Sequence, residues 1–348
     1  MTAERIDIEV EAIDPHDAAS FDAWFAVWHT IDMEQYPSGP GWQYEELLAM
    51  ACDTEGAYQR RPLVAWRAGV AAGAVGLELT RHENHHLARV DVRVLPEHRR
   101  LGVGTALVEM AERIAAAEGR TELAASDEIP VRPDYVDAAE PFARHLGFRV
   151  AQRMVRRRID LPLDAEHAEA LRNDRRATPS GYTLVTFGNR WPDQDLDDRC
   201  ELGRRMSTDM PAGEQVLDEQ VWDAARVRAL EASVAAQNRD KVTTAARHDA
   251  SGRLVGFTEV AIPLGAPESA WQHDTLVMRE HRGHGLGFAM KLANCFAIEE
   301  RHPAVRRVNT WNAVENAPMI AVNEDLGFHV EAHSTDWHRP IAPRPDSA

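Results

Sequence analysis

Arg99-Arg100-Leu101-Gly102-Val103-Gly104 and Arg282-Gly283-His284-Gly285-Leu286-Gly287 are two copies of one pattern, Arg-x-x-Gly-x-Gly, that lie 183 residues apart. Each copy follows an extended apolar run and precedes a run in which apolar residues have helical spacing. Glycine lets the backbone turn tightly, and the first N–H groups of a helix have no partner within it. A strand, a glycine loop and a helix start therefore form a site for an anion. The two copies predict two related domains and up to two such sites.

The flanks of both loops repeat as well. The shared positions are Asp91, Val94, Glu97 and His98 before the first loop and Asp274, Val277, Glu280 and His281 before the second. A Leu-Gly-Phe follows each loop, with its glycine 45 residues after Gly102 in the first copy and 42 residues after Gly285 in the second. Repetition at so many offsets indicates an internal duplication.

A chain of 348 residues is long for one hydrophobic core and suits two domains. We predict an N-terminal domain over 1–162, a linker over 163–180, a C-terminal domain over 181–340 and a tail over 341–348. In the first half, alternation and helical spacing predict strands near 6–10, 63–67, 71–79, 90–94, 121–125 and 149–161, and helices near 20–30, 104–118 and 138–146. In the second half they predict strands near 182–187, 242–246, 254–262, 275–278, 305–310 and from 329, and helices within 194–237 and near 287–300 and 316–326.

The composition narrows the class of protein. The net charge of −17 disfavours nucleic acid as a partner, because phosphate contacts need a basic surface. An acidic chain attracts cationic amines, although plain solubility explains the charge equally well. No apolar run approaches the length of a membrane helix, and the N-terminus lacks the apolar core of a signal peptide, so we expect a cytoplasmic protein without membrane contact. Cys52, Cys200 and Cys295 are few and scattered, which predicts neither disulfides nor a metal site.

Two well-known phosphate-binding loops do not fit the repeated pattern. A P-loop ends in Gly-Lys-Ser/Thr, which neither copy has. The dinucleotide fingerprint Gly-x-Gly-x-x-Gly has Leu107 in place of its third glycine in the first copy, and the second copy also fails it. That fingerprint follows the first strand of its unit, whereas both loops here follow a later strand.

The loops instead resemble the signature of the GNAT superfamily of acyl-CoA-dependent N-acetyltransferases. The run from Val92 to Gly104 matches the family pattern almost position by position, and Thr310, Asn312, Asn316 and Met319 match the family's C-terminal helix and its entry. The resemblance covers most of residues 5–161 and 181–338. It implies an α/β (α+β) chain of two tandem GNAT domains, each a mixed and mostly antiparallel sheet flanked by helices, an architecture similar to that of mycothiol synthase.

This resemblance implies acetyl-CoA as co-substrate and no metal. The loop N–H groups and the helix start would bind the pyrophosphate. A backbone N–H of the central strand would face the thioester carbonyl like an oxyanion hole. Asn316 matches a family position that contacts the pantetheine arm. The implied cofactor-binding residues are Val92, Val94, Arg99, Arg100, Leu101, Gly102, Val103, Gly104 and Thr105 in the first half, and Thr275, Val277, Arg282, Gly283, His284, Gly285, Leu286, Gly287 and Asn316 in the second.

The usual catalytic side chains of the family are absent from both halves. Ala88 and Trp271 occupy the position of the glutamate base of the histone acetyltransferase branch, and Ala143 and Asn323 that of the tyrosine acid. The remaining catalytic candidates are Asp91, its repeat Asp274, Glu78 with Glu259 on the corresponding strand, and Asn323. A structural carboxylate bonded to a neighbouring helix is the favoured interpretation of the aspartates. Two interpretations stay open for the aromatic residues of the first half. The tyrosines approach the first site from loops or belong to the surface or core, and these are Tyr36 and Tyr135. The tryptophans line an acceptor pocket or the core, and these are Trp24, Trp28 and Trp42.

The sequence therefore predicts an enzyme that moves an acetyl group from acetyl-CoA to a primary amine of a small molecule by direct attack, since no cysteine stands beside an obvious base. The first half has the loop closer to the family pattern and is favoured for catalysis. Three alternatives stay open: a non-catalytic acyl-CoA sensor or scaffold, a mycothiol synthase-type enzyme, and an acyltransferase that uses aminoacyl-tRNA. We expect a monomer or homodimer.

Overall fold

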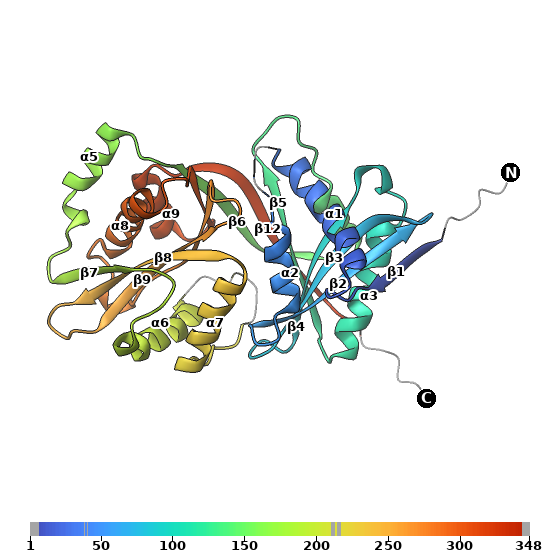
Figure 1. The fold of residues 1–348 in the computed structure, drawn as a ribbon, viewed down its shortest axis with the longest axis horizontal. Coiled ribbons are helices and arrows are strands. Elements are labelled where there is room, and N and C mark those ends of the chain that lie inside the picture. The colour runs from blue at the N-terminus through green and yellow to red at the C-terminus, as the bar shows by residue number, and fades with distance from the viewer. Residues whose placement is uncertain (1–6, 38, 40, 210–212, 214–216, 343–348) are drawn as a thin grey trace. The chain divides into compact units, whose positions relative to one another are not determined.

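The computed structural model describes residues 7–37, 39, 41–209, 213 and 217–342. The chain forms two compact units. The first unit contains the residues up to Gln152 together with those from Ser334 on, and the second unit contains Arg153–His333. Figure 1 shows helices and strands mixed within each unit, as the α/β prediction requires.

The first unit is built on a sheet in which β1, β2, β3, β4 and β5 are neighbours in that order, with β12 after β5. All its described pairs are antiparallel except β4 with β5, which is parallel. Its elements are β1 (Ile8–Ala12), α1 (Ala18–Gln35), α2 (Tyr44–Cys52), β2 (Tyr58–Arg67), β3 (Val70–Thr80), β4 (Leu87–Val94), the short η1 (Pro96–His98), α3 (Val103–Ala117), β5 (Glu122–Pro130), α4 (Ala139–His145) and the start of β6 (Arg149–Asp160).

Helices cover both faces of this sheet. Leu63 and Ala65 of β2 point into the core beneath α3, while Val64 between them points into a second core beneath α1 and α2. This alternation follows from the two-residue period of a strand, and it makes β2 apolar throughout its buried part. The helix α2 is an element that the apolar spacing of the sequence did not predict.

The second unit repeats the plan with the neighbour order β6, β11, β10, β9, β8, β7. The pair β10–β11 is parallel, and the other described pairs are antiparallel. Its elements are the end of β6, α5 (Ala165–Asn173), η2 (Arg175–Ala177), β7 (Tyr182–Phe187), η3 (Asp193–Asp195), α6 (Leu196–Asp209), α7 (Ala224–Ala236), β8 (Arg239–His248), β9 (Leu254–Pro263), β10 (Ser269–Val277), η4 (Arg279–His281), α8 (Leu286–Arg301), β11 (Arg307–Ala313), α9 (Ala317–Leu326) and the start of β12 (His329–Pro340).

The segment predicted as a linker, 163–180, contains the helix α5 and the turn η2. The strand β6 begins in the first unit and ends in the second, and β12 does the reverse. The end of β12 is fastened inside the first unit, where Trp337 is 1% exposed and donates from Nε1 to Asp127 Oδ2 at 2.8 Å. The domain limits at 162 and 180 stay a prediction from the repeat, while the compact units exchange their last strands.

Replacing Trp337 with alanine tests whether the last strand stabilises the first unit. The large cavity and the lost hydrogen bond to Asp127 lower the free energy of unfolding by about 3–5 kcal/mol in urea titrations. Val330→Ala, on the same strand but 41% exposed, is the matched control and changes it by less than about 0.5 kcal/mol. Equal effects of the two substitutions would contradict this role of the strand.

Lys291 in α8 is an exception to the packing of the second unit, because its ammonium is buried with no carboxylate of the described residues within ion-pair distance. It lies 5.0 Å from the ring centroid of Phe328, and burial lowers its pKa to about 8. Since the unfolded chain holds this proton up to a higher pH, the lysine destabilises the fold below pH 8, and the penalty fades as the pH rises towards 10.5. We expect Lys291→Met to be more stable than the wild type at pH 7. In thermal unfolding, this difference shrinks by pH 10; a gap independent of pH would contradict the assignment.

Candidate functional site

In both units the parallel pair of strands ends before the central strand does. The strand β4 pairs with β5 only over Leu87–Val90 but continues to Val94. In the second unit β10 pairs with β11 only over Ser269–Trp271 and continues to Val277. The antiparallel neighbours β3 and β9 stay paired to the end of these strands. Each central strand therefore has one open edge just before its glycine loop.

Backbone donors point into this opening. The N–H of Leu95 bonds Ala72 on β3 at 3.1 Å, so the alternation of a strand turns the N–H groups of Val92 and Val94 to the open side. By the same argument, the bond from Met278 to Val255 at 2.9 Å turns those of Thr275 and Val277 to the open side. Unpaired backbone groups at such a place require a partner. These are the donors that the sequence predicted for a thioester carbonyl.

The glycine loops supply a second set of donors. Gly102 and Gly285 are left-handed, with φ of 90° and 74°, and form the N-caps of α3 and α8 without any side-chain cap. Arg100 and Gly283, at matching positions, are left-handed as well, with φ of 61° and 84°. The N–H groups of the first turn in each helix are thus uncapped and carry the positive end of the helix dipole.

The arginine of the pattern fastens the loop to the strand. Arg99 Nε donates to the carbonyl oxygen of Val94 at 3.0 Å, and Arg282 Nε donates to that of Val277 at 3.0 Å. A carboxylate from the covering helix holds each guanidinium: Glu34 of α1 in the first unit and Asp209 of α6 in the second. The two arginines therefore fix the shape of the loop. That they also contact a phosphate stays a prediction.

The two loops differ in what packs against them. A Cβ on Gly104 would lie 2.9 Å from Phe142 of α4, whereas a Cβ on Gly287 would meet only Val322, at 4.0 Å. In the second unit Arg176 of η2 lies against the loop, because a Cβ on Gly285 would be 3.0 Å from it. Its guanidinium stacks 4.1 Å from the ring centroid of Phe288. Part of the predicted linker thus forms a wall of the second site.

In the first unit, ion pairs occupy the two carboxylate candidates. Asp91 lies on the open part of β4 and accepts from Arg93 at 2.9 Å. Arg93 also pairs with Asp32 of α1 at 3.0 Å, and burial raises the pKa of Asp32. Glu78 faces Arg89, beside the part of β4 that is still paired with β5, and bonds Arg60 at 2.8 Å. The structure therefore brings Asp91 to the opening but not Glu78.

The aromatic candidates of the first unit have structural contacts. Trp24 and Trp28 are buried and stacked, with ring centroids 4.5 Å apart, so both belong to the core. The hydroxyl of Tyr36 donates to Glu128 of β5. Burial raises the pKa of Tyr135, and the nearby charge of Glu34 raises it further. Asp32 and Glu128 are residues at this site that the repeat could not reveal, because the second copy does not share them.

The second unit has a bulge in its central strand. Gln272 faces Val260 and Thr275 faces Thr258, so both His273 and Asp274 lie opposite Glu259. No register shift interrupts the pairing of β4 with β3. The two strand pairs can be aligned where Val277 faces Gly256 in the second unit and Val94 faces Gly73 in the first. In this alignment Gly76 of β3 occupies the position of Glu259 of β9. There a Cβ would lie 3.1 Å from the ring of Trp28, which fills the space in the first unit. Glu78 and Glu259 are thus not equivalent.

Charged groups surround this bulge. Glu259 is 4% exposed, accepts from Trp191 Nε1 at 3.1 Å and pairs with Lys241 at 3.2 Å. Burial opposes its ionisation, but the charges of Lys241 and Arg199 prevail and lower the pKa of Glu259 to about 2.

The two bulge residues are shifted in opposite senses. Burial and the charge of Glu259 raise the pKa of Asp274. Crowding by protein atoms and the charges of Lys241 and Arg239 lower the pKa of His273 to about 4, although the residue is partly exposed to solvent. At neutral pH the bulge therefore presents a neutral imidazole and a carboxylate that binds a proton more readily than usual.

Two asparagines complete the second unit. Asn323 is fully buried and donates from Nδ2 to Asn312 Oδ1 at 2.5 Å, while its own Oδ1 has no partner among the described residues. A carboxamide can donate a hydrogen bond but cannot release a proton, so Asn323 cannot act as a general acid. Asn316 caps α9 by accepting from the N–H of Met319 at 3.4 Å. Its contact with a pantetheine arm stays a prediction.

The fold and the paired loops agree with one protein family. The model of the acetyltransferase (GNAT) family matches residues 22–148 and again residues 207–328. The chain belongs to this family. It is an N-acyltransferase with two tandem GNAT domains, as the sequence predicts.

Solved structures support this assignment. A tandem GNAT protein from the clavulanic acid biosynthesis pathway, determined without AcCoA, is 30% identical, with a TM-score of 0.80 over 97% of this chain and 99% of the other. A GCN5-related N-acetyltransferase from Sphaerobacter thermophilus is 18% identical, with a TM-score of 0.67 over 98% and 97%. At that identity the second likeness shows the fold alone. No curated protein matches the chain.

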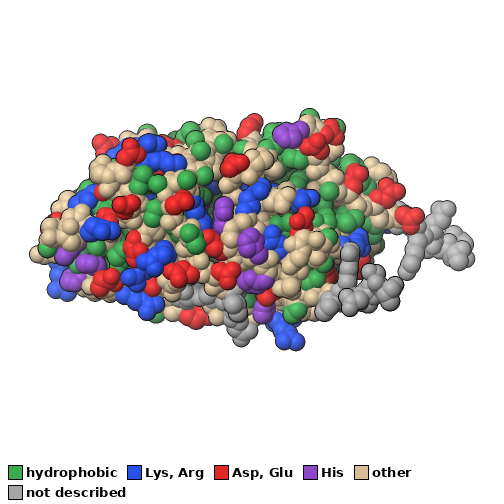
Figure 2. Space-filling view, turned by 90° about the horizontal axis from the view of Figure 1, so that it is seen from below, with side chains coloured by type: hydrophobic (Ala, Val, Ile, Leu, Met, Phe, Trp, Pro, Cys, Tyr) green, Lys and Arg blue, Asp and Glu red, His purple; other side chains and the backbone are tan. Residues whose placement is uncertain are grey.

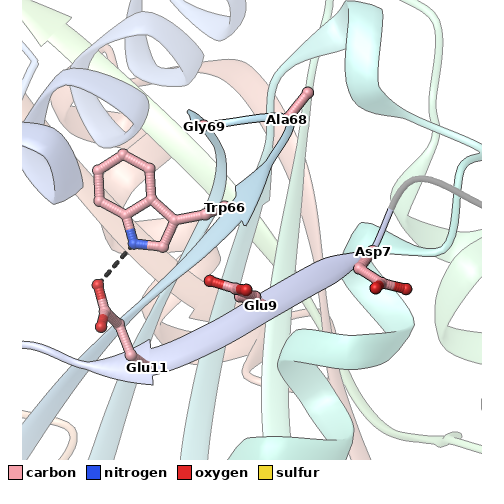
Figure 3. A pocket seen from close by; sticks show the side chains of 6 residues that line it. All are labelled: Asp7, Glu9, Glu11, Trp66, Ala68 and Gly69. Atoms are coloured by element: carbon pink, nitrogen blue, oxygen red, sulfur yellow. Dashed lines mark hydrogen bonds between the residues drawn. The ribbon is translucent and has the colours of Figure 1, made fainter.

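Other surfaces of the described residues are less informative. A cavity of about 470 Å³ lies at the edge strand β1, lined by Asp7, Glu9, Glu11, Trp66, Ala68 and Gly69. Figure 3 shows the indole of Trp66 directed at Glu11, to which it donates at 2.6 Å, with Glu9 between Glu11 and Asp7 along the chain. The face in Figure 2 mixes acidic and basic side chains, unlike the continuous basic stripe of nucleic-acid binders. Within the described chain, no helix is long and apolar enough to cross a membrane, and no three His, Cys, Asp or Glu side chains gather as a metal site.

Replacing Glu259 with glutamine tests the charge balance around the bulge. It leaves Lys241 in the interior without its counter-charge, and we expect the free energy of unfolding to fall by about 3–5 kcal/mol. Glu78→Gln breaks a more exposed pair on the corresponding strand and is expected to lower it by less than about 1 kcal/mol. Urea unfolding at pH 7 measures both. Similar losses for the two variants would contradict the buried pairing.

Proposed function

We propose that the protein transfers an acetyl group from acetyl-CoA to a primary amine of a small molecule by direct attack. The observation that carries this proposal is the open end of each central strand, where unpaired N–H groups adjoin the uncapped start of a helix. The pyrophosphate of CoA would bind at the helix start. The pantetheine arm would take the place of the missing neighbour strand, and the thioester carbonyl would accept a hydrogen bond from an unpaired N–H of the central strand.

The second unit is the better candidate for the chemistry. Its opening adjoins a carboxylate, Asp274, that has no ion-pair partner among the described residues and whose pKa is raised. Asp91, the repeat of Asp274, is bound by Arg93 in the first unit. This reverses the preference that the loop pattern alone suggests, because the loop concerns the cofactor and not the proton transfer.

The reaction would proceed in one complex. Asp274 accepts a proton from the bound amine, directly or through a water molecule, and the nitrogen attacks the thioester carbonyl carbon. An N–H of Thr275 or Val277 stabilises the oxyanion. The C–S bond then breaks, and the thiolate takes a proton from solvent. Asn323 offers at most a hydrogen bond here.

The first unit suits a binding role. Arg93 already holds both Asp91 and Asp32, so no free carboxylate of the described residues remains beside its opening. We propose that this unit binds acyl-CoA without turnover, which places the sensor alternative in one half of the chain.

Replacing Asp274 with asparagine tests the assignment of the base. We expect kcat for thiol release from acetyl-CoA, measured across a panel of amines, to fall by about 10²–10⁴-fold. The affinity for acetyl-CoA in calorimetry should stay the same. Asp91→Asn is the matched control at the repeated position and should retain activity. Full activity of Asp274→Asn with loss in Asp91→Asn would move the chemistry to the first unit.

Calorimetric stoichiometry tests the cofactor sites. Two molecules of acetyl-CoA should bind per chain. Gly102→Val or Gly285→Val should each remove one of them, because a β-branched residue strains a left-handed cap. Only Gly285→Val should abolish turnover. Binding of acetyl-CoA that neither variant weakens would refute the loops as cofactor sites.

A further inference from the structure

Arg199 of α6 is a buried cation that has no hydrogen-bond or ion-pair partner among the described residues. The residue is 4% exposed, and its guanidinium makes no hydrogen bond or ion pair with any described residue. Its Nε and Nη1 are completely covered, yet no acceptor lies within reach. Buried polar groups are almost always paired, and an unpaired buried charge costs several kcal/mol. A bound ligand that supplies the partner missing among the described residues would account for this arrangement.

Aromatic rings fix the guanidinium in position. Its central carbon lies 4.4 Å from the ring centroid of Trp222, 4.8 Å from that of Phe257 and 5.4 Å from that of Trp191. The backbone of α6 also lies close to the guanidinium of Arg199, because a Cβ on Gly203 would lie 2.8 Å from its Nη1. Rings stabilise the positive charge but accept no conventional hydrogen bond, so they position the donors without satisfying them.

The charge of Arg199 acts on the proposed reaction site. It lowers the pKa of Glu259 and opposes the rise in the pKa of Asp274. The charge of Arg199 is not needed to neutralise Glu259, since Lys241 is already paired with Glu259 at 3.2 Å. An anion beside the bulge would therefore find a preorganised cation, with Nη2 as the guanidinium nitrogen that is not covered.

We propose that Arg199 binds a carboxylate of the acceptor, so that the substrate is an amine that also carries a carboxylate, as amino acids do. This rests on the function proposed above, because it places the amine of the same molecule at Asp274. Guanidinium and carboxylate form short, charge-assisted hydrogen bonds, which gain strength where water is excluded. The carboxylate would supply an acceptor that the described residues lack.

Acetylation rates of matched substrates test this. The probes are α-, β- and γ-amino acids, the amide of each, and an aminoalkyl phosphate of similar length. For the best amino acid, we expect kcat/KM at least about 100-fold above that of its amide. Arg199→Met should raise KM for the acid on the order of 100-fold and leave KM for the amide unchanged, while a change in kcat that follows from the higher pKa of Asp274 should be the same for both substrates. Arg199→Lys should recover part of the loss, because it restores the charge.

Two controls separate recognition from structure. Arg226→Met removes a cation that stacks on the same ring, 4.6 Å from the centroid of Trp222, but comes from α7 and is only half-buried. It should leave KM unchanged. The melting temperature of Arg199→Met should equal or exceed that of the wild type, since an unpaired buried charge is removed. A lower melting temperature with equal losses for acid and amide would assign Arg199 a structural role and overturn the proposal.

The remaining outcomes are equally decisive. If acids and amides are acetylated equally by the wild type, the carboxylate proposal fails while the acetyltransferase function stands. If the aminoalkyl phosphate is preferred, the assigned class of anion is wrong. If no amine in the panel is acetylated, although acetyl-CoA binds, the proposed function fails and this inference fails with it.

Discussion

A parallel strand pair that stops before its central strand does is the constraint on which each unit depends. Beyond Val90 in β4 and Trp271 in β10, the strand keeps one neighbour and loses the other. Its N–H and C=O groups on that side still require partners. Arg99 and Arg282 satisfy the last carbonyl of each strand and, by doing so, hold the glycine loop over the opening. The N–H groups that remain are available to a ligand with acceptors of its own.

The two units share this frame and differ in what fills it. In the first unit Trp28 covers Gly76, and Arg93 ties Asp91 to Asp32, so apolar and ionic contacts close the site. In the second unit a one-residue bulge and the buried Glu259 keep charged groups beside the opening. A duplicated fold therefore preserves the anion-binding frame through its backbone. The side chains around it decide whether proton transfer is possible, and they have diverged.

Much of the fold can be predicted from the sequence, because strands and helices with one apolar face show their period directly. The strand Tyr182–Phe187 and the helices after both loops agree with the predicted ranges within a few residues. The exchange of β6 and β12 between units is not visible in the repeat, since a strand has the same apolar pattern whichever sheet it joins. The same holds for the site. The glycine loops have a sequence signature because few residues adopt left-handed φ, whereas the charge of Arg199 acts on Glu259 only because the folded unit brings α6 and β9 together.

Hydrogen exchange of the backbone amides, with and without CoA, measures whether the open strand ends and helix starts bind the cofactor. We expect slower exchange at Thr275, Val277 and the loop Gly283–Gly287 when CoA is bound, with matching protection at Val92, Val94 and Gly102–Thr105. The antiparallel edges of β3 and β9 should not change. Protection confined to other segments, or none at these amides under saturating CoA, would contradict the claim that the open strand ends and helix starts form the cofactor site.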